Sequence, residues 1–125
     1  MPSDPSPKSG NRVRTGRTFE QQAAQFFTNQ GFVILDQNWQ ASHKEIDLVV
    51  RKDDLVVFVE VKAARSDQFG HPIEKLSKKK IANLAEAARR YLHEKQIRNC
   101  DIRFDVVTFL DGQLEHFPAA FMAEE

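Results

Sequence analysis

One stretch, residues 44–62, constrains the fold of this chain more than any other. Its sequence is KEIDLVVRKDDLVVFVEVK, in which two apolar, β-branched runs flank a polar patch from Arg51 to Asp54. This pattern is typical of two antiparallel strands joined by a tight turn. Neither run has a consistently polar face. We therefore expect a β-hairpin with both faces covered, as in the centre of a sheet between other layers.

Three charged residues interrupt these apolar runs: Asp47, Glu60 and Lys62. Side chains alternate between faces along a strand, so Glu60 and Lys62 share a face. If the first and last residues of the polar patch flank the turn, Asp47 pairs with Phe58 and lies diagonal to Glu60, at roughly 7–8 Å between Cα atoms. The sequence therefore predicts two carboxylates and an ammonium at one partly buried place.

Neighbouring carboxylates such as Asp47 and Glu60 raise each other's pKa, and a divalent cation keeps both ionised. Mg²⁺ suits them, because proteins hold it with one or two carboxylates plus waters and phosphate oxygens. Mn²⁺ is the alternative cation. Lys62 would orient or deprotonate a water on the metal and stabilise charge on a phosphate. The opposing interpretation is a plain ion pair of little energetic value at a strand end, but the apolar surroundings favour the metal site.

The length of 125 residues fits one domain with a single core. We expect residues 1–15, rich in Pro, Ser and Gly, to be a disordered tail and residues 16–125 to be the domain. No apolar run approaches the roughly 20 residues that span a bilayer, and the N-terminus lacks the apolar segment of a secretory signal. Cys100 is the single cysteine, which excludes an internal disulfide and suits a reducing compartment. We predict a cytoplasmic protein that does not bind membranes.

Hydrophobic periodicity predicts the order helix, three strands, helix, two strands, in the α/β class. The first helix spans about residues 17–29, with Thr15 or Thr18 as its cap. A strand begins at residues 32–35, continues to about residue 40 and leads into the hairpin. The second helix spans about residues 77–95, with an alternative start near residue 73. Strands follow at 101–110 and 113–117, and Pro118 is expected to end the last one.

Two further acids receive different predictions. Glu20 lies in the first turn of the first helix, where it is either a partner of the helix dipole or a third carboxylate that points toward Asp47. Asp105 is a lone acid between apolar residues of a strand. For Asp105 we expect a structural pairing with Arg103 or with the next strand.

The net charge is zero, with 18 basic and 18 acidic residues, so overall charge does not indicate nucleic-acid binding. A lysine run from Lys78 to Lys80 opposes the dipole of the second helix. A phosphate bound there would offset the cost, and a solvated run is the alternative. Arg65 and Gln68 are donors in the loop that follows Lys62. Arg17, next to the N-terminal tail, could contact a phosphate backbone once a ligand is present. The alternative is that this segment only solubilises the chain.

The pattern of Asp47, a turn and Glu60-Val61-Lys62 is that of the PD-(D/E)xK nuclease superfamily. The order of elements, with Glu20, Asp47, Glu60 and Lys62 at these positions, resembles the restriction-endonuclease-like core of archaeal-type Holliday junction resolvases. The chain more closely resembles the YraN-like family of small bacterial proteins assigned to that superfamily. The resemblance covers about residues 14–121. It rests on Gly16-Arg17 with Glu20 and Ala23, Glu45-Ile46-Asp47-Leu48, Phe58-Val59-Glu60-Val61-Lys62, Phe69-Gly70, Lys80, Arg103-Phe104-Asp105-Val106-Val107 and Ala120-Phe121.

The resemblance implies a restriction-endonuclease-like α/β fold whose helices flank a central mixed sheet of about five strands. It implies Asp47, Glu60 and the Val61 carbonyl as Mg²⁺ ligands, Lys62 as the catalytic lysine, and Glu20 as the helix-borne acid of the resolvase branch.

The sequence departs from the family pattern at Lys44, where Gly is usual, and at Ala64, where Arg is frequent. Lys44 adds positive charge at the edge of the site, and we count it among the nucleic-acid contacts. The expected activity is Mg²⁺-dependent hydrolysis of DNA, branched or otherwise structured. The alternative is a non-catalytic module that keeps the nuclease fold and binds nucleic acid or protein. A resolvase-like role would also require a homodimer.

Overall fold

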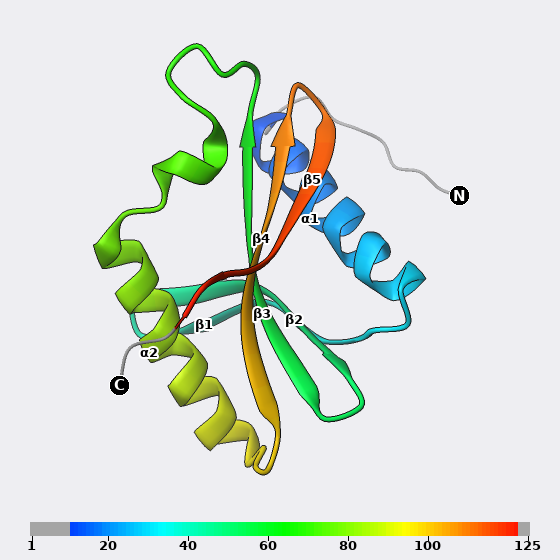
Figure 1. The fold of residues 1–125 in the computed structure, drawn as a ribbon, viewed down its shortest axis with the longest axis vertical. Helices are drawn as coiled ribbons and strands as arrows, with labels where there is room; N and C mark the ends of the chain where they lie inside the picture. Colours follow the sequence, from blue (N-terminus) through cyan, green and yellow to red (C-terminus); the bar gives the residue numbers. More distant parts are fainter. Residues whose placement is uncertain (1–10, 123–125) are drawn as a thin grey trace.

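A computed structural model describes the backbone of residues 11–122. The order of its elements is the predicted one, and Figure 1 follows it from blue to red. The elements are α1 (Asn11–Asn29), β1 (Val33–Ala41), β2 (Lys44–Lys52), β3 (Leu55–Ala64), the short 3-10 helix η1 (Pro72–Lys75), α2 (Lys78–Lys95), β4 (Asp101–Leu110) and β5 (Gln113–Phe121).

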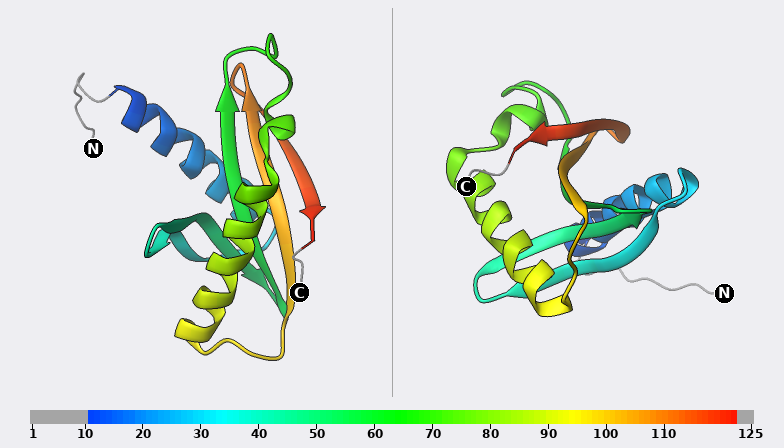
Figure 2. Two further views of the ribbon diagram at one scale, coloured as in Figure 1. Left: turned by 90° about the vertical axis from the view of Figure 1, so that its left-hand side faces the viewer. Right: turned by 60° about the horizontal axis from the view of Figure 1, so that its bottom comes forward.

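The strands form one mixed sheet in the order β1-β2-β3-β4-β5. Strands β3 and β4 are parallel, and the other neighbours are antiparallel. A parallel pair needs a crossover connection, which η1 and α2 supply here. The sheet is strongly twisted, so the β1–β2 hairpin turns away from the long strands β3 and β4 (Figure 2). The predicted α/β class and mixed sheet are confirmed.

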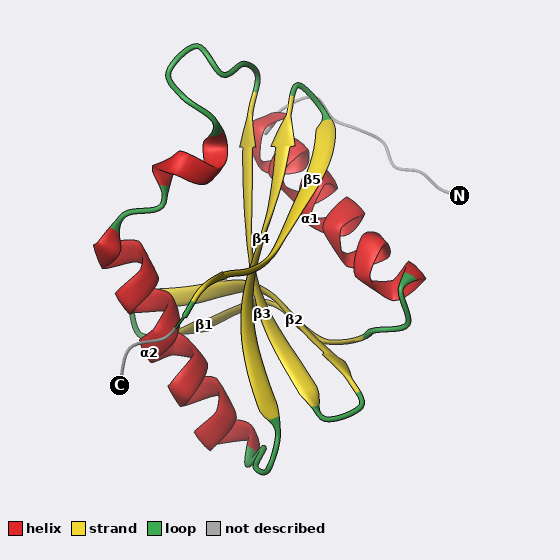
Figure 3. Ribbon diagram, viewed as in Figure 1, coloured by secondary structure: helices red, strands yellow, loops and turns green. Residues whose placement is uncertain are grey.

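Helices α1 and α2 cover opposite faces of this sheet (Figure 3). Val57 and Val59 of β3 pack with α1, whereas Val56 and Phe58 pack with α2. Burying a side chain of this size stabilises the fold by about 1.5–3 kcal/mol. The double coverage explains why the runs in residues 44–62 have no polar face.

The hairpin of β2 and β3 is confirmed, but its predicted register is wrong. Lys52 and Leu55 flank the turn, which begins at Asp53 with a positive φ of 54°. Asp adopts this left-handed conformation more readily than most residues do, so a two-residue turn forms inside the polar patch. As a result Phe58 pairs with Val49 rather than with Asp47, and Asp47 and Glu60 each lie one residue beyond the last pair, Leu48 and Val59.

The predicted start of the first helix is also wrong. Helix α1 begins at Asn11, so Thr15 and Thr18 lie inside it and neither is its cap. Arginine is a good helix former, and the Pro- and Ser-rich composition ends before Asn11. Residues 1–10 of the predicted tail lie outside the described part of the chain, and residues 11–15 belong to α1.

The later elements follow the sequence more closely. Ser77 caps α2, where its hydroxyl accepts a hydrogen bond from the Lys80 N–H at 3.1 Å. The prediction that Pro118 ends the last strand is wrong, because β5 continues to Phe121. Proline is tolerated on an edge strand and near a bulge. Strand β5 is such an edge, and the β4–β5 register shifts in this region.

Candidate active site

Strands β2 and β3 separate at the acidic residues that interrupt them. Their ladder of paired residues ends at Leu48 and Val59, although both strands continue. Ile46 packs with α2 while Leu48 packs with α1, whereas residues two apart on a regular strand share a face. Strand β2 therefore twists sharply at Asp47, and the Val61 N–H of β3 donates to Asp47 Oδ2 at 2.8 Å.

Glu60 lies beside two ammonium groups at this point of separation. Its Oε2 is 3.7 Å from Lys62 Nζ and 3.4 Å from Lys80 Nζ. Lys62 is two residues further along β3, whereas Lys80 comes from the first turn of α2. The Glu60 carboxylate is buried and both lysines are partly exposed, so the two positive charges stand between a buried acid and solvent.

Asp47 carries a less well compensated charge. Its residue is 7% exposed, and burial together with the charge of Glu60 raises the pKa of its carboxyl from 3.8 to about 7. The hydrogen bond from Val61 acts in the opposite direction, and the charges of Glu20 and Glu45 add smaller increases. Near neutral pH this carboxyl therefore holds a proton part of the time.

Glu20 reaches the site from α1, on the far side of the sheet from α2. The helix is held there by Ala23 and Phe27 in the core and by Phe19, whose ring stacks on Phe109 at 4.6 Å. Glu20 is half-buried, and its charge raises the pKa of Asp47. In residues 11–122 no three Asp, Glu, His or Cys side chains form a group that could hold a metal. The acid from α1 thus acts on Asp47 through charge.

The donor set of this site is the pair Asp47 and Glu60. Both side chains offer hard carboxylate oxygens, and both are buried where a bare negative charge is unfavourable. Mg²⁺ commonly takes one or two carboxylates and completes its coordination with water and phosphate oxygens. Burial and the neighbouring negative charges raise the pKa of Asp47, and a bound cation would offset both effects. The residues therefore fit this ion.

Comparison with known proteins places the chain in a family. The model of the Uncharacterised protein family UPF0102 matches residues 19–109. The chain belongs to the UPF0102 family. A UPF0102 protein of Sulfurihydrogenibium is 32% identical over 114 residues, which cover 91% of this chain and 99% of the relative. A UPF0102 protein of Syntrophomonas wolfei is 43% identical over 106 residues, covering 82% of this chain and 92% of the relative.

The predicted nucleic-acid contacts of this UPF0102 protein are only partly brought together. Lys80 lies at the acidic pair, and Arg65 lines a cavity that also contains Lys62. Lys78, two residues before Lys80, faces a different cavity beside Phe121. A lysine run therefore divides between two sides of α2.

The remaining predicted contacts lie further out. Gln68 is exposed in the loop after β3, and Lys44 begins β2 three positions before Asp47. Arg17 belongs to α1, and its side chain lies outside the described part of the chain. In the described residues 11–122, no helix of this UPF0102 protein has the length and apolar character needed to cross a membrane.

Two contributions to the site were not predicted from the sequence. Lys80 was expected to bind phosphate, but its contact with the Glu60 carboxylate was not foreseen. Glu45 raises the pKa of Asp47, although its own side chain accepts a hydrogen bond from Gln40 at 3.1 Å. A signal for Lys80 was present, because a lysine in the first turn of a helix needs a nearby negative partner.

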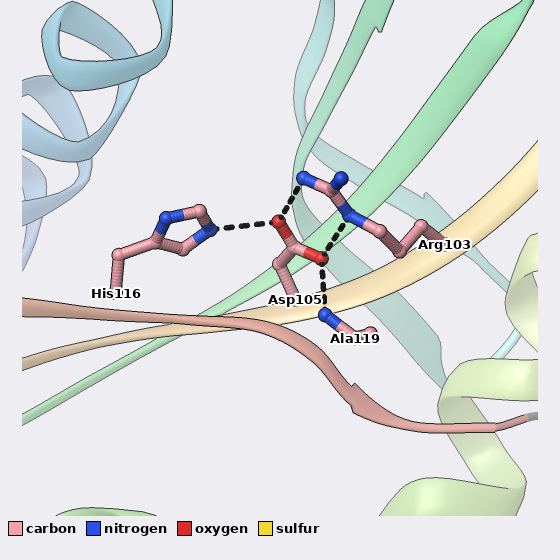
Figure 4. Close-up of polar contacts among 4 residues, drawn as sticks. All are labelled: Arg103, Asp105, His116 and Ala119. Atoms are coloured by element: carbon pink, nitrogen blue, oxygen red, sulfur yellow. Dashed lines mark hydrogen bonds and ion pairs between the residues drawn. The ribbon is translucent and has the colours of Figure 1, made fainter.

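A second buried acid, Asp105 on β4, has the structural role that was predicted. Its carboxylate accepts hydrogen bonds from Arg103 Nε and Nη2, both at 2.8 Å, and from the Ala119 N–H at 3.0 Å. His116 Nε2 lies 2.8 Å from the same carboxylate (Figure 4). The hydrogen bonds to Asp105 raise the pKa of the Arg103 guanidinium. This cluster joins β4 to β5, and its carboxylate is fully buried among these partners.

Proposed function

We propose that this protein is a Mg²⁺-dependent nuclease that hydrolyses phosphodiester bonds in DNA, branched or otherwise structured, in the cytoplasm. One observation carries the proposal. Two buried acids, Asp47 and Glu60, lie one residue beyond the last pair of β2 and β3, where the strands separate, and Lys62 and Lys80 lie within 4 Å of Glu60 Oε2. Carboxylates that need a cation and ammoniums that can meet a phosphate are the groups that such hydrolysis uses.

Each residue has a role that its position supports. Asp47 and Glu60 would hold Mg²⁺, with the Val61 carbonyl as a further ligand. The ion, when bound, polarises the phosphoryl oxygen and lowers the pKa of water. Lys62 is close enough to solvent to donate hydrogen bonds to a phosphate oxygen and stabilise its growing negative charge. Glu20 would keep the local field negative and so favour cation binding.

The ion pairs of Lys62 and Lys80 with Glu60 Oε2 suggest how these two lysines could contact a phosphate. In the metal-free protein these ammoniums compensate the buried charge of Glu60. If Asp47 and Glu60 held a cation, its charge would compensate Glu60, and Lys62 and Lys80 would be available to a phosphate. Both lysine side chains are partly exposed, so side-chain motion alone would allow this.

The test is cleavage of labelled junction, flap, single-stranded and duplex DNA with Mg²⁺, with Mn²⁺ and with EDTA. Asp47→Ala and Lys62→Ala should each reduce the rate by roughly 10²-fold or more, since each removes a charge needed in the transition state. Lys95→Ala is the matched control, because Lys95 Nζ lies 3.7 Å from Asp36 Oδ2, away from the site. Cleavage that survives both site variants would come from a contaminant and would refute the proposal.

A second candidate is a DNA-binding module that keeps the fold without cutting. The observation in its favour is that two side chains of the protein itself, Lys62 and Lys80, compensate the charge of Glu60. Such a module would bind DNA equally with Mg²⁺ or EDTA and would cleave none of the substrates.

A nuclease acting on both sides of a branch also needs two active sites, so we expect a homodimer on junction DNA. Analytical ultracentrifugation of the complex measures this.

A further inference from the structure

Beside Lys62 the surface is hollowed by a cavity of about 580 Å³. This volume is in the range of roughly 300–1,000 Å³ typical of small-molecule sites. Its walls come from the end of β3, the loop after it and η1. The cavity therefore adjoins the proposed site and has a lysine of that site in its wall.

An exposed aromatic ring stands in this wall. Phe69 is 79% exposed, although a phenyl ring is normally buried. The Asp67 carbonyl accepts a hydrogen bond from the Gly70 N–H at 2.9 Å, which closes a turn around Phe69. Buried Pro72 anchors the chain just beyond. The loop is thus fixed at two points while it presents the ring to solvent.

Gly70 is required for this geometry. Its φ is +99°, a conformation that side chains disfavour, and an added Cβ would lie 2.9 Å from Glu74 Oε1. The pattern Phe69-Gly70 therefore supplies an aromatic ring together with the glycine that allows its loop to turn. Core packing does not explain the phenylalanine at position 69, because its ring lies outside the core.

Three cations line the same cavity: Lys62, Arg65 and Lys75. Proteins that bind single-stranded nucleic acid combine basic residues for the backbone with aromatic rings on which bases stack. A base inside intact duplex reaches such a ring only after unstacking, which costs a few kcal/mol. A base that is already unpaired avoids this cost.

We propose that this cavity binds an unpaired nucleotide, with its base on the Phe69 ring and its phosphates near Arg65 and Lys75. Where the protein cuts DNA, the substrate then contains a single-stranded segment, as in a flap, beside the scissile phosphate. This second statement rests on the proposed nuclease function. The binding statement does not depend on it.

Binding is measured without metal, in EDTA, by fluorescence anisotropy of a labelled oligo(dT) and of a duplex of equal length. Phe69→Ala should weaken oligo(dT) binding roughly 5-fold to 150-fold, the equivalent of one stacked base, and leave duplex binding unchanged. Phe69→Trp should retain the affinity, and its fluorescence should be quenched by oligo(dT). Val33→Ala is the control, because Val33 is 63% exposed on β1, outside the cavity.

Unchanged oligo(dT) affinity in Phe69→Ala, equal loss on duplex, or no oligo(dT) binding by the unmodified protein would each overturn the inference. The two proposals fail separately. Phe69-dependent binding without cleavage supports the nucleotide cavity and refutes the nuclease. Metal-dependent cleavage that is indifferent to Phe69→Ala supports the nuclease and refutes the cavity.

Discussion

Asp47 and Asp105 are both buried acids on inner strands of one sheet, yet their surroundings differ. Asp105 has no exposed surface, and Arg103, His116 and the Ala119 N–H contact its two oxygens. Asp47 accepts one hydrogen bond within the described residues, from Val61. Its other neighbours include Glu60, whose charge opposes its ionisation.

The difference distinguishes a structural acid, whose charge is compensated within the protein, from an acid that a ligand could compensate. A buried carboxylate with its hydrogen bonds satisfied holds strands together, and removing it leaves its partners unpaired. A buried carboxylate with too few hydrogen-bond or cationic partners is a candidate functional group, because carboxyls with strongly shifted pKa values cluster at functional sites. Replacing each acid should therefore change the stability of the protein in opposite directions.

The largest effect is expected at Asp105. Asp105→Ala leaves the Arg103 guanidinium without its two charge-assisted hydrogen bonds and removes the acceptor of the Ala119 N–H. Breaking a buried pair in this way costs about 3–5 kcal/mol of folding free energy. Urea unfolding monitored by circular dichroism measures the loss. A cost below about 1 kcal/mol would place Asp105 in the same class as Asp47.

The opposite sign is expected at Asp47. In the metal-free protein the native state holds the Asp47 proton between about pH 4 and 7, where the unfolded chain releases it. The stability linked to this group is therefore complete below about pH 4 and is lost as the pH rises through 7. Asp47→Asn never ionises and should be more stable than the wild type at pH 8, by up to about 4 kcal/mol, the free energy that corresponds to this pKa difference.

Two controls accompany Asp47→Asn in thermal melting with EDTA and with Mg²⁺. The advantage of the variant should shrink when the pH falls from 8 to 4. Mg²⁺ should raise the melting temperature of the wild type and leave that of the variant unchanged, because only the carboxylate binds it. A clear loss of metal-free stability at pH 8 would mean that Asp47 is structural.

Local sequence was sufficient to predict the two buried runs, the Ser77 start of α2 and the pairing of Asp105. Periodicity, capping residues and a nearby arginine carry these signals. The register of the hairpin could not be predicted from local sequence, because the polar patch contains more than one pair of residues that can flank a turn. The choice depends on the positive φ of Asp53.

The candidate site was less predictable than the fold. The sequence pattern brought Asp47, Glu60 and Lys62 together as a hypothesis, and the structure places them around the point where β2 and β3 separate. The approach of Lys80 depends on how the crossover lays α2 over β3. The effect of Glu20 on Asp47 depends on how α1 packs against the opposite face of the sheet.

A smaller effect is expected at Lys80. Its ammonium competes with a cation for Glu60 Oε2, at 3.4 Å. Lys80→Gln should therefore tighten Mg²⁺ binding roughly 2-fold to 5-fold, which corresponds to the worth of a partly exposed ion pair. Isothermal titration calorimetry measures the affinity. Lys78→Gln is the matched control, since Lys78 lies in the same helical turn and faces another cavity. Equal tightening in both variants would indicate a general charge effect.

The smallest effects concern the acids around Asp47, and they rank in a definite order. Glu60 raises the pKa of Asp47 most, Glu20 less and Glu45 least. Replacing each in turn by Gln should therefore lower that pKa in the same order, read from the ¹³C shift of the Asp47 carboxyl in an NMR titration. A fall with Glu20→Gln larger than with Glu45→Gln would support a site shared by both sheet faces. No response to Glu20→Gln would remove α1 from the site, because a charge that leaves Asp47 unaffected cannot help it to hold a cation.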